Sequence, residues 1–258
     1  MTSSAKTTSE ARLGTSALCS AAKAPALVQV PAAIGSQATV LRTRRGQALS
    51  LSLEGGETIF IVRSGLLTLQ ITLPGSARQI VAMLSSGDVF RSSFAPPHAE
   101  AALVAAGAGE ISRMRLAALE TAASADPAVR HYLDQASASR LARQAIHAAT
   151  LGQFDCEQRV ATFFIELALR TGVSAASGGV VFELPFNRKD IADYLGLNPD
   201  TLSRIMSRFK AAGLIAHSDR NRAVVRDVAA LAARTPAARA LAAISAGKPA
   251  EASLHACV

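Results

Sequence analysis

The sequence predicts an α+β protein, in which an all-β region is followed by a long helix and then by a helical domain that includes a small β-hairpin. Two observations predict this order. Up to about position 111, apolar and polar residues alternate between turn glycines that recur roughly every 8–12 residues, which is typical of an antiparallel sandwich or barrel. After position 127, apolar residues recur at steps of three and four, which is the period of a helix.

At 258 residues, the chain is long enough for two domains with separate cores. The first 25 residues share their Ser, Thr and Ala content with transit peptides, but they lack the continuous apolar core of a secretory signal. A disordered tail is therefore the favoured interpretation of this segment. We expect that tail at 1–25, a β domain at 26–125, a long helix at 126–152, a helical domain at 153–234 and an alanine-rich tail at 235–258.

Composition limits the possible function classes. The 27 Lys and Arg residues exceed the 19 Asp and Glu residues, which is compatible with nucleic-acid binding without establishing it. No stretch approaches about 18 uninterrupted apolar residues, so we expect no membrane span. Cys19, Cys156 and Cys257 are too far apart for a metal or redox motif, which indicates a reduced, cytoplasmic protein. We find no nucleophile elbow, metal cluster or phosphate loop, so the sequence predicts neither an enzyme nor a metal site.

Four short segments carry the β prediction. Leucines alternate with serines in the first and with Thr and Gln in the third, so each strand should have one buried and one exposed face. The segments are ALSLSL at 48–53, TIFIV at 58–62, LLTLQITL at 66–73 and QIVAML at 79–84.

The long helix should start after Pro127 and extend for about 35 Å, at about 1.5 Å per residue. A long helix between two domains is a natural dimer seam. Arg140 interrupts its apolar stripe, so the alternative is a helix that packs on its own domain. The residues predicted for the seam are Val129, Leu133, Ala136, Arg140, His147 and Leu151.

A second helix is predicted at 156–170. Cys156 near its start has two interpretations: a redox-responsive thiolate favoured by the helix start, or a buried structural thiol, which we favour. The predicted apolar face consists of Val160, Phe163, Phe164, Leu167 and Ala168.

Two short helices with a tight link follow. Asn187 is a suitable N-cap, and Asp190 can complete a capping box with it. Gly196 should end the first helix, and Asn198 should cap the second with Pro199 at its first position. This spacing is that of a helix-turn-helix.

The second of these helices should have a core face and an exposed face, and it should end at Gly213. Its core face comprises Leu202, Ile205, Met206 and Phe209, and its exposed face comprises Asp200, Ser203, Arg204, Ser207 and Arg208. Arginine supplies the fork of donors that guanine requires in a major groove. LIAHS and AVVRD flank the turn DRNR, which predicts a hairpin wing that places Arg220 and Arg222 at phosphates. The alternative is an amphipathic helical hairpin with a solvated charged face.

The segment LPFNRKDIADYLGLNPDTLSRIMSRFKAAGLI resembles the helix-turn-helix of the Crp/Fnr family of bacterial regulators, especially its Fnr/FixK branch. The order of elements from position 38 to 227 is similar as well. The resemblance implies a β-roll sensor domain related to cyclic-nucleotide-binding domains, a dimerisation helix and a winged helix-turn-helix. It also implies a homodimer that regulates transcription by binding a TTGA-type palindrome in double-stranded DNA and that contacts RNA polymerase.

Carried over residue by residue, the base-reading trio of this branch falls on Asp200, Ser203 and Arg204. Asp200 stands where the branch usually has Glu, so a water can bridge the longer gap to a base. The residues expected to contact DNA phosphates are Asn187, Arg188, Thr201, Ser207, Arg208, Arg220 and Arg222.

The resemblance does not identify a cofactor. Gly87 and Asp88 precede Arg91, but the later stretch PPHAEAALVAAGA lacks an arginine, so we do not expect cyclic AMP binding. Cys19 is the one N-terminal cysteine and cannot supply a four-cysteine iron–sulfur site. Haem binding through His98 stays open, although a lone histidine after two prolines is typical of a loop.

The candidate signals are oxygen, nitric oxide or redox state. The alternative function is a ligand-binding β-roll protein whose helical domain mediates protein contacts.

Overall fold

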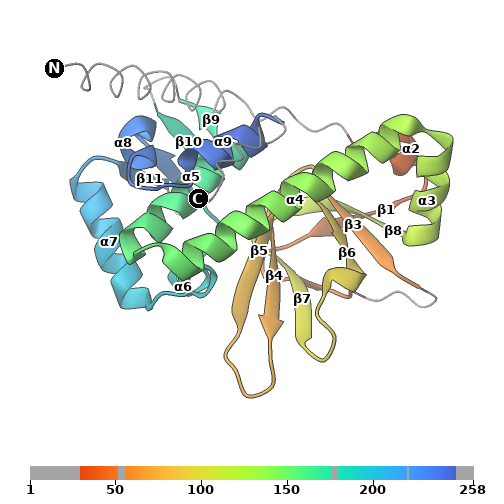
Figure 1. Cartoon of the computed structure of the whole chain (residues 1–258), viewed down its shortest axis with the longest axis horizontal. Coiled ribbons are helices and arrows are strands. Elements are labelled where there is room, and N and C mark those ends of the chain that lie inside the picture. Colours follow the sequence, from red (N-terminus) through yellow and green to blue (C-terminus); the bar gives the residue numbers. More distant parts are fainter. Residues whose placement is uncertain (1–29, 52–55, 176–178, 220, 248–258) are drawn as a thin grey trace, which may run out of the picture.

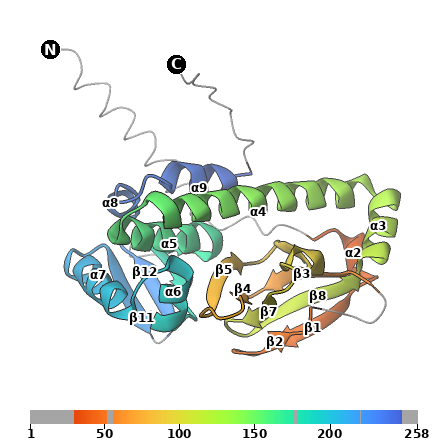
Figure 2. The same ribbon diagram turned by 60° about the horizontal axis from the view of Figure 1, so that its bottom comes forward.

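The computed structural model describes residues 30–51, 56–175, 179–219 and 221–247. Helix α4 (Pro127–Gln153) runs along both the β domain and the helical domain, as Figures 1 and 2 show. Among the helices of these ranges, none is both long enough and apolar enough to cross a membrane. The predicted tail at 1–25 lies outside the described residues.

The β domain consists of two four-stranded antiparallel sheets. One has the order β1-β8-β3-β6 and the other β2-β7-β4-β5. The strands are β1 (Thr39–Thr43), β2 (Ala48–Leu49), β3 (Thr58–Ser64), β4 (Leu67–Thr72), β5 (Gln79–Leu84), β6 (Val89–Arg91), β7 (Glu100–Ala105) and β8 (Gly109–Arg115). A short helix, α2 (Ala32–Gly35), precedes them, a 3-10 turn, η1 (Ser92–Phe94), follows β6, and α3 (Leu116–Ala125) follows β8.

The strand predictions for 58–62, 66–73 and 79–84 are confirmed by β3, β4 and β5. Of the predicted strand 48–53, β2 covers Ala48–Leu49 and positions 50 and 51 are not strand, whereas positions 52 and 53 lie outside the described residues. In each strand every second side chain points between the two sheets, as the period of two residues requires, and these side chains form a core. That core includes Phe60, Leu69, Phe90, Leu103 and Ile111.

A second core lies on the other face of the β1-β8-β3-β6 sheet, under α2, α3 and α4. Ile59 and Ile61 of β3 meet Val129 and Tyr132 of α4 there, and Val129 is fully buried. Asp126 caps α4 by accepting a hydrogen bond from the Ala128 amide at 2.9 Å. The helix is therefore fixed to its own β domain at its N-terminal end.

Of the six residues predicted for a dimer seam, Val129 is fully buried within its own chain, and the other five are half-buried. Leu133 and Ala136 pack against the Val129 core. Arg140 stacks over the Phe94 ring at 4.3 Å and His147 over Tyr194 at 4.1 Å. Leu151 lies beside Gly196. The chain's own two domains therefore cover part of the apolar stripe, and the dimer seam stays a prediction.

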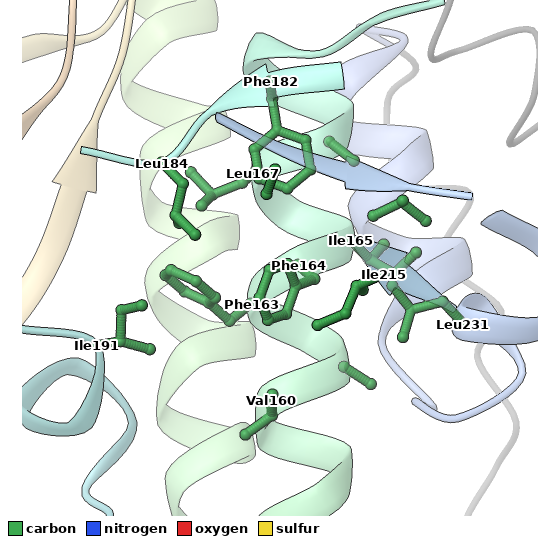
Figure 3. Packing of buried hydrophobic residues seen from close by; sticks show 14 of the residues in the cluster. Val160, Phe163, Phe164, Ile165, Leu167, Phe182, Leu184, Ile191, Ile215 and Leu231 are labelled. Atoms are coloured by element: carbon green, nitrogen blue, oxygen red, sulfur yellow. The ribbon is translucent and has the colours of Figure 1, made fainter. Parts of the chain in front are cut away.

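Helix α5 (Cys156–Thr171) forms the centre of the helical domain. The predicted apolar face is buried as expected, and so is every other residue from Val160 to Arg170. Figure 3 shows why: Phe163, Phe164 and Leu167 of α5 pack against Phe182, Ile191, Ile215 and Leu231, which approach the helix from different elements. A helix covered on several sides needs apolar residues on several faces.

The remaining elements surround α5. They are β9 (Val173–Ser174), β10 (Val180–Glu183), α6 (Arg188–Leu195), α7 (Pro199–Ala211), β11 (Ile215–Asp219), β12 (Arg222–Val225), α8 (Val228–Ala232) and α9 (Ala238–Ser245). The strands form one antiparallel sheet of order β11-β12-β10-β9. The predicted tail at 235–258 includes α9, which buries Leu241 in the same core as α5. Positions 248–258 lie outside the described residues.

Candidate nucleic-acid interface

Helix α6 begins with the predicted capping box. The Asn187 side chain accepts from the Asp190 amide at 2.8 Å, and the Asp190 carboxylate accepts from the Asn187 amide at 3.3 Å. Gly196 ends the helix in the left-handed region at φ 60°, where glycine carries no steric cost. These local bonds fix both ends of the first helix of the helix-turn-helix.

Helix α7 begins with the second predicted cap. Asn198 accepts from the Asp200 amide at 2.8 Å, with Pro199 at the first helical position. The predicted core face is buried, and each of its residues keeps at most 1% of its surface exposed: Leu202, Ile205, Met206 and Phe209. The opposite face is exposed, and it presents Asp200, Ser203, Arg204, Ser207 and Arg208.

The two serines on this face are oriented by the helix backbone. Ser203 Oγ donates to Pro199 O at 2.8 Å, and Ser207 Oγ donates to Ser203 O at 2.9 Å. Each hydroxyl has a single hydrogen, which the backbone carbonyl takes, so the oxygen can only accept from a further partner. The exposed face therefore offers acceptors at Asp200 and Ser203 beside the donor fork of Arg204.

The predicted phosphate contacts differ in their surroundings. Arg222 on β12 is exposed, whereas Arg220 lies outside the described residues. Arg208 forms an ion pair with Glu157 of α5 at 3.6 Å. Arg188 is half-buried and contacts the Met206 sulfur, and burial lowers the pKa of its guanidinium. Thr201 is half-buried as well, and the side-chain oxygen of Asn187 is engaged in the cap.

Strands β11 and β12 form the predicted hairpin wing beside α7. The Leu214 amide donates to Phe209 O at 2.9 Å and so joins the end of α7 to the start of the wing. The register shifts between His217 and Asp219. Figure 2 shows α7, β11 and β12 together at the end of the molecule away from the β domain.

In the β domain, the residues near the expected nucleotide-phosphate position are engaged by a carboxylate. Arg91 donates two hydrogen bonds to Glu57, at 2.9 and 3.1 Å, and Ser93 donates to it as well. These bonds, led by the one from Arg91, lower the pKa of Glu57 to about 2. His98 lies exposed in the loop between η1 and β7, at φ 60°.

Cys156 is exposed at the start of α5, so the favoured interpretation of a buried thiol is wrong. Within the described ranges, no three His, Cys, Asp or Glu residues are grouped so as to hold a metal ion.

Sequence reasoning missed the outward face of α4. Ala138, Leu141, Ala145 and Ala148 are exposed there at alternating steps of three and four, and Leu141 keeps 69% of its surface. This is the heptad spacing of a coiled-coil seam. Small residues hide the signal from a search for large apolar side chains, although the spacing can be read from the sequence.

Comparison with known proteins gives concordant results. A model of the Crp-like helix-turn-helix domain matches residues 158–234. The nitrogen fixation regulation protein FixK of Azorhizobium caulinodans is 30% identical over 203 residues, which are 79% of this chain and 80% of that protein. The solved structure of FixK2 from Bradyrhizobium japonicum has a TM-score of 0.64 at 29% identity and covers 77% of this chain and 97% of that chain. A CooA mutant from Carboxydothermus hydrogenoformans shares the fold, with a TM-score of 0.61 at 20% identity over 78% of this chain and 88% of that chain.

The match to FixK extends well beyond the helix-turn-helix, because the domain model covers only residues 158–234. The β domain and α4 therefore share the resemblance with the DNA-binding domain. This result confirms the fold predicted from the sequence, and it agrees with the expectation that the protein is not an enzyme. The chain belongs to the Crp/Fnr family of DNA-binding transcription regulators and is similar to FixK.

Proposed function

We propose that the protein acts as a homodimer that binds a palindromic DNA element with TTGA-type half-sites. One α7 would lie in each of two major grooves on the same side of the duplex, about 34 Å apart. The observation that carries the proposal is the exposed face of α7, where Asp200, Ser203 and Arg204 lie together on a helix whose opposite face is fully buried.

We assign each side chain of this trio to a DNA base. Arg204 would donate two hydrogen bonds to O6 and N7 of a guanine, and Asp200 would accept from N4 of a nearby cytosine, directly or through a water. The outward oxygen of Ser203 would accept from a neighbouring base, because its hydrogen is bonded to Pro199 O. The exposed Arg222 and the predicted contacts at Asn187, Arg188, Thr201, Ser207, Arg208 and Arg220 would bind phosphates.

The dimer would form through α4, and its contact would include the outward stripe of Ala138, Leu141, Ala145 and Ala148. Alanines allow two helix axes to approach closely, and Leu141 supplies the large apolar contact. RNA polymerase is the further partner that the family resemblance suggests, and a regulator of chromosomal genes would work in the cytoplasm. Oxygen, nitric oxide and redox state stay the candidate signals.

The competing function is a ligand-binding β-roll whose helical domain docks on another protein. A protein-docking face would carry apolar and aromatic residues at its centre. The exposed face of α7 instead carries two arginines, an aspartate and two serines, which favours DNA.

The experiment is a binding titration on a palindrome of TTGA half-sites and on scrambled DNA at two salt concentrations. Arg204→Ala should weaken binding to the palindrome by about 2–6 kcal/mol, since a bidentate contact contributes about 1–3 kcal/mol per half-site. Binding to scrambled DNA should hardly change, because phosphate contacts supply it. The matched control is Arg222→Ala, which should weaken both DNAs alike and flatten the salt dependence. Equal loss on both DNAs for Arg204→Ala would make that residue a phosphate contact.

A further inference from the structure

The DNA-binding domain is joined to α4 by a very short connection. Helix α4 ends at Gln153 and α5 begins at Cys156, with Phe154 and Asp155 between them in extended conformations. Two extended residues can act as a hinge, since backbone rotation there would swing the whole domain about the end of α4. Contacts away from the connection must therefore set the orientation of the domain.

One such contact is a clamp between the β4–β5 hairpin and α6. Arg78 lies just before β5, and its guanidinium donates to the carboxylates of Asp190 and Asp193, each at 3.0 Å. The neighbouring Gln79 donates to the backbone oxygen of Asp193. Helix α6 contacts β5 of this hairpin, and Figure 2 shows the two side by side. The first helix of the helix-turn-helix is thus bound to the β domain.

A second contact is a buried polar network around the β5–β6 turn. Arg170 of α5 donates to Ser85 Oγ at 3.1 Å, to Met83 O at 3.0 Å and to the Asp88 carboxylate. It also bonds Glu166 at 3.0 Å, and Glu166 accepts from the Tyr194 hydroxyl of α6 at 3.1 Å. The side chain of Arg170 keeps only 3% of its surface.

Helix α4 meets the same turn. The Tyr132 hydroxyl donates to Gly87 O at 2.9 Å, and Arg143 pairs with Asp88 at 3.5 Å. Apolar packing continues across the boundary as well, because Ile80 and Met83 of β5 belong to the core that surrounds α5. The β5–β6 turn therefore holds the long helix and the DNA-binding domain in one fixed arrangement.

We propose that this junction, and the Arg78 clamp in particular, determines which half-site spacing the protein accepts. The inference rests on the proposed dimeric DNA binding. If α4 sets the two-fold axis and the junction fixes each α7 relative to α4, the distance and rotation between the two α7 helices are fixed. One added base pair moves a half-site by about 3.4 Å along the axis and by about 35° around it. A rigid junction rejects that change, and a loosened one tolerates it.

The test uses the full-length protein and DNA selected from a random library by the wild-type protein. Affinity is measured on the selected palindrome, on versions with one base pair added to or removed from the spacer, and on a single half-site. We expect wild-type affinity to fall by about tenfold or more on both altered spacers, because the DNA must be twisted to fit. Arg78→Glu, which places three carboxylates together, should reduce that discrimination at least about threefold while half-site affinity stays unchanged.

Two control variants show whether the effect comes from the clamp. Arg44→Glu makes the same change of charge in the exposed β1–β2 turn, at the sheet edge opposite β5, and should keep wild-type discrimination. Arg78→Glu combined with Asp193→Arg reverses one ion pair of the clamp and should restore most of the discrimination between spacers. Unchanged discrimination in Arg78→Glu, with wild-type protein that binds a palindrome, overturns the spacing proposal alone. Selection of no palindrome by the wild-type protein overturns the proposed function as well.

Discussion

Replacement of Arg170 by methionine should strongly destabilise the protein. The guanidinium is almost fully buried and bonds the carboxylates of Asp88 and Glu166, whose side chains keep 11% and 9% of their surfaces. Methionine fills a similar volume but leaves Glu166 without the cation it pairs with and Asp88 with only its longer contact to Arg143. Removal of one partner from a buried ion pair costs about 3–5 kcal/mol, and we expect the free energy of unfolding to fall by about that amount.

Urea unfolding and calorimetry measure this change. A loss of about 3–5 kcal/mol corresponds to a fall in Tm of about 6–20 °C for a protein of this size. Arg234→Met is the matched control, because Arg234 forms an ion pair with Glu157 at 2.6 Å but keeps 50% of its side-chain surface. An exposed pair contributes about 0–1 kcal/mol. If Arg170→Met lowered stability no more than Arg234→Met does, the network would not hold the domains together and the reasoning would be refuted.

Three further changes test other parts of the structure. Leu141→Glu should convert the proposed dimer to a monomer in sedimentation at micromolar concentration without loss of monomer stability, whereas Leu73→Glu, at a leucine that is 54% exposed, should leave that dimer intact. Burial lowers the pKa of His147 from 6.5, against a smaller opposing effect of Glu166. Below about pH 6.5 the unfolded state therefore binds a proton at this histidine that the folded state does not bind. The free energy of unfolding should fall as the pH drops below about 6.5 and should level off below the folded pKa. A stability–pH profile of His147→Phe that matched the wild type would contradict this. Asn198→Ala should cost about 1 kcal/mol in urea unfolding through loss of the α7 cap, and a change below the error of the measurement would show that the cap contributes nothing.

The helix-turn-helix could be predicted from the sequence because its determinants are local. The caps at Asn187 and Asn198 bond amides two or three residues away, and Gly196 ends α6 through its own backbone conformation. The buried and exposed faces of α7 follow from a period of 3.6 residues along one helix. Neither feature depends on the rest of the fold, so the predicted reading face coincides with the face that the structure exposes.

The role of α4 could only be half predicted. Its periodicity reveals an apolar stripe, but the pattern is the same whether a second chain or the protein's own domains cover the stripe. The β domain buries Val129, and α6 stacks Tyr194 on His147, so the chain itself covers part of the stripe. The same limit applies to Cys156, whose exposure depends on what packs over the first turn of α5.

The junction between the domains was decided by tertiary structure alone. Arg170 and Asp88 are 82 positions apart, and Arg78 and Asp193 are 115 apart. Nothing in the sequence distinguishes these four residues from ordinary charged residues, most of which lie on the surface. Local propensity, capping and periodicity act over one or two turns, and they determined the helices, the strands and the exposed face of α7. The burial and pairing of distant charges arise only when the folded chain brings the β5–β6 turn against α5 and excludes water between them.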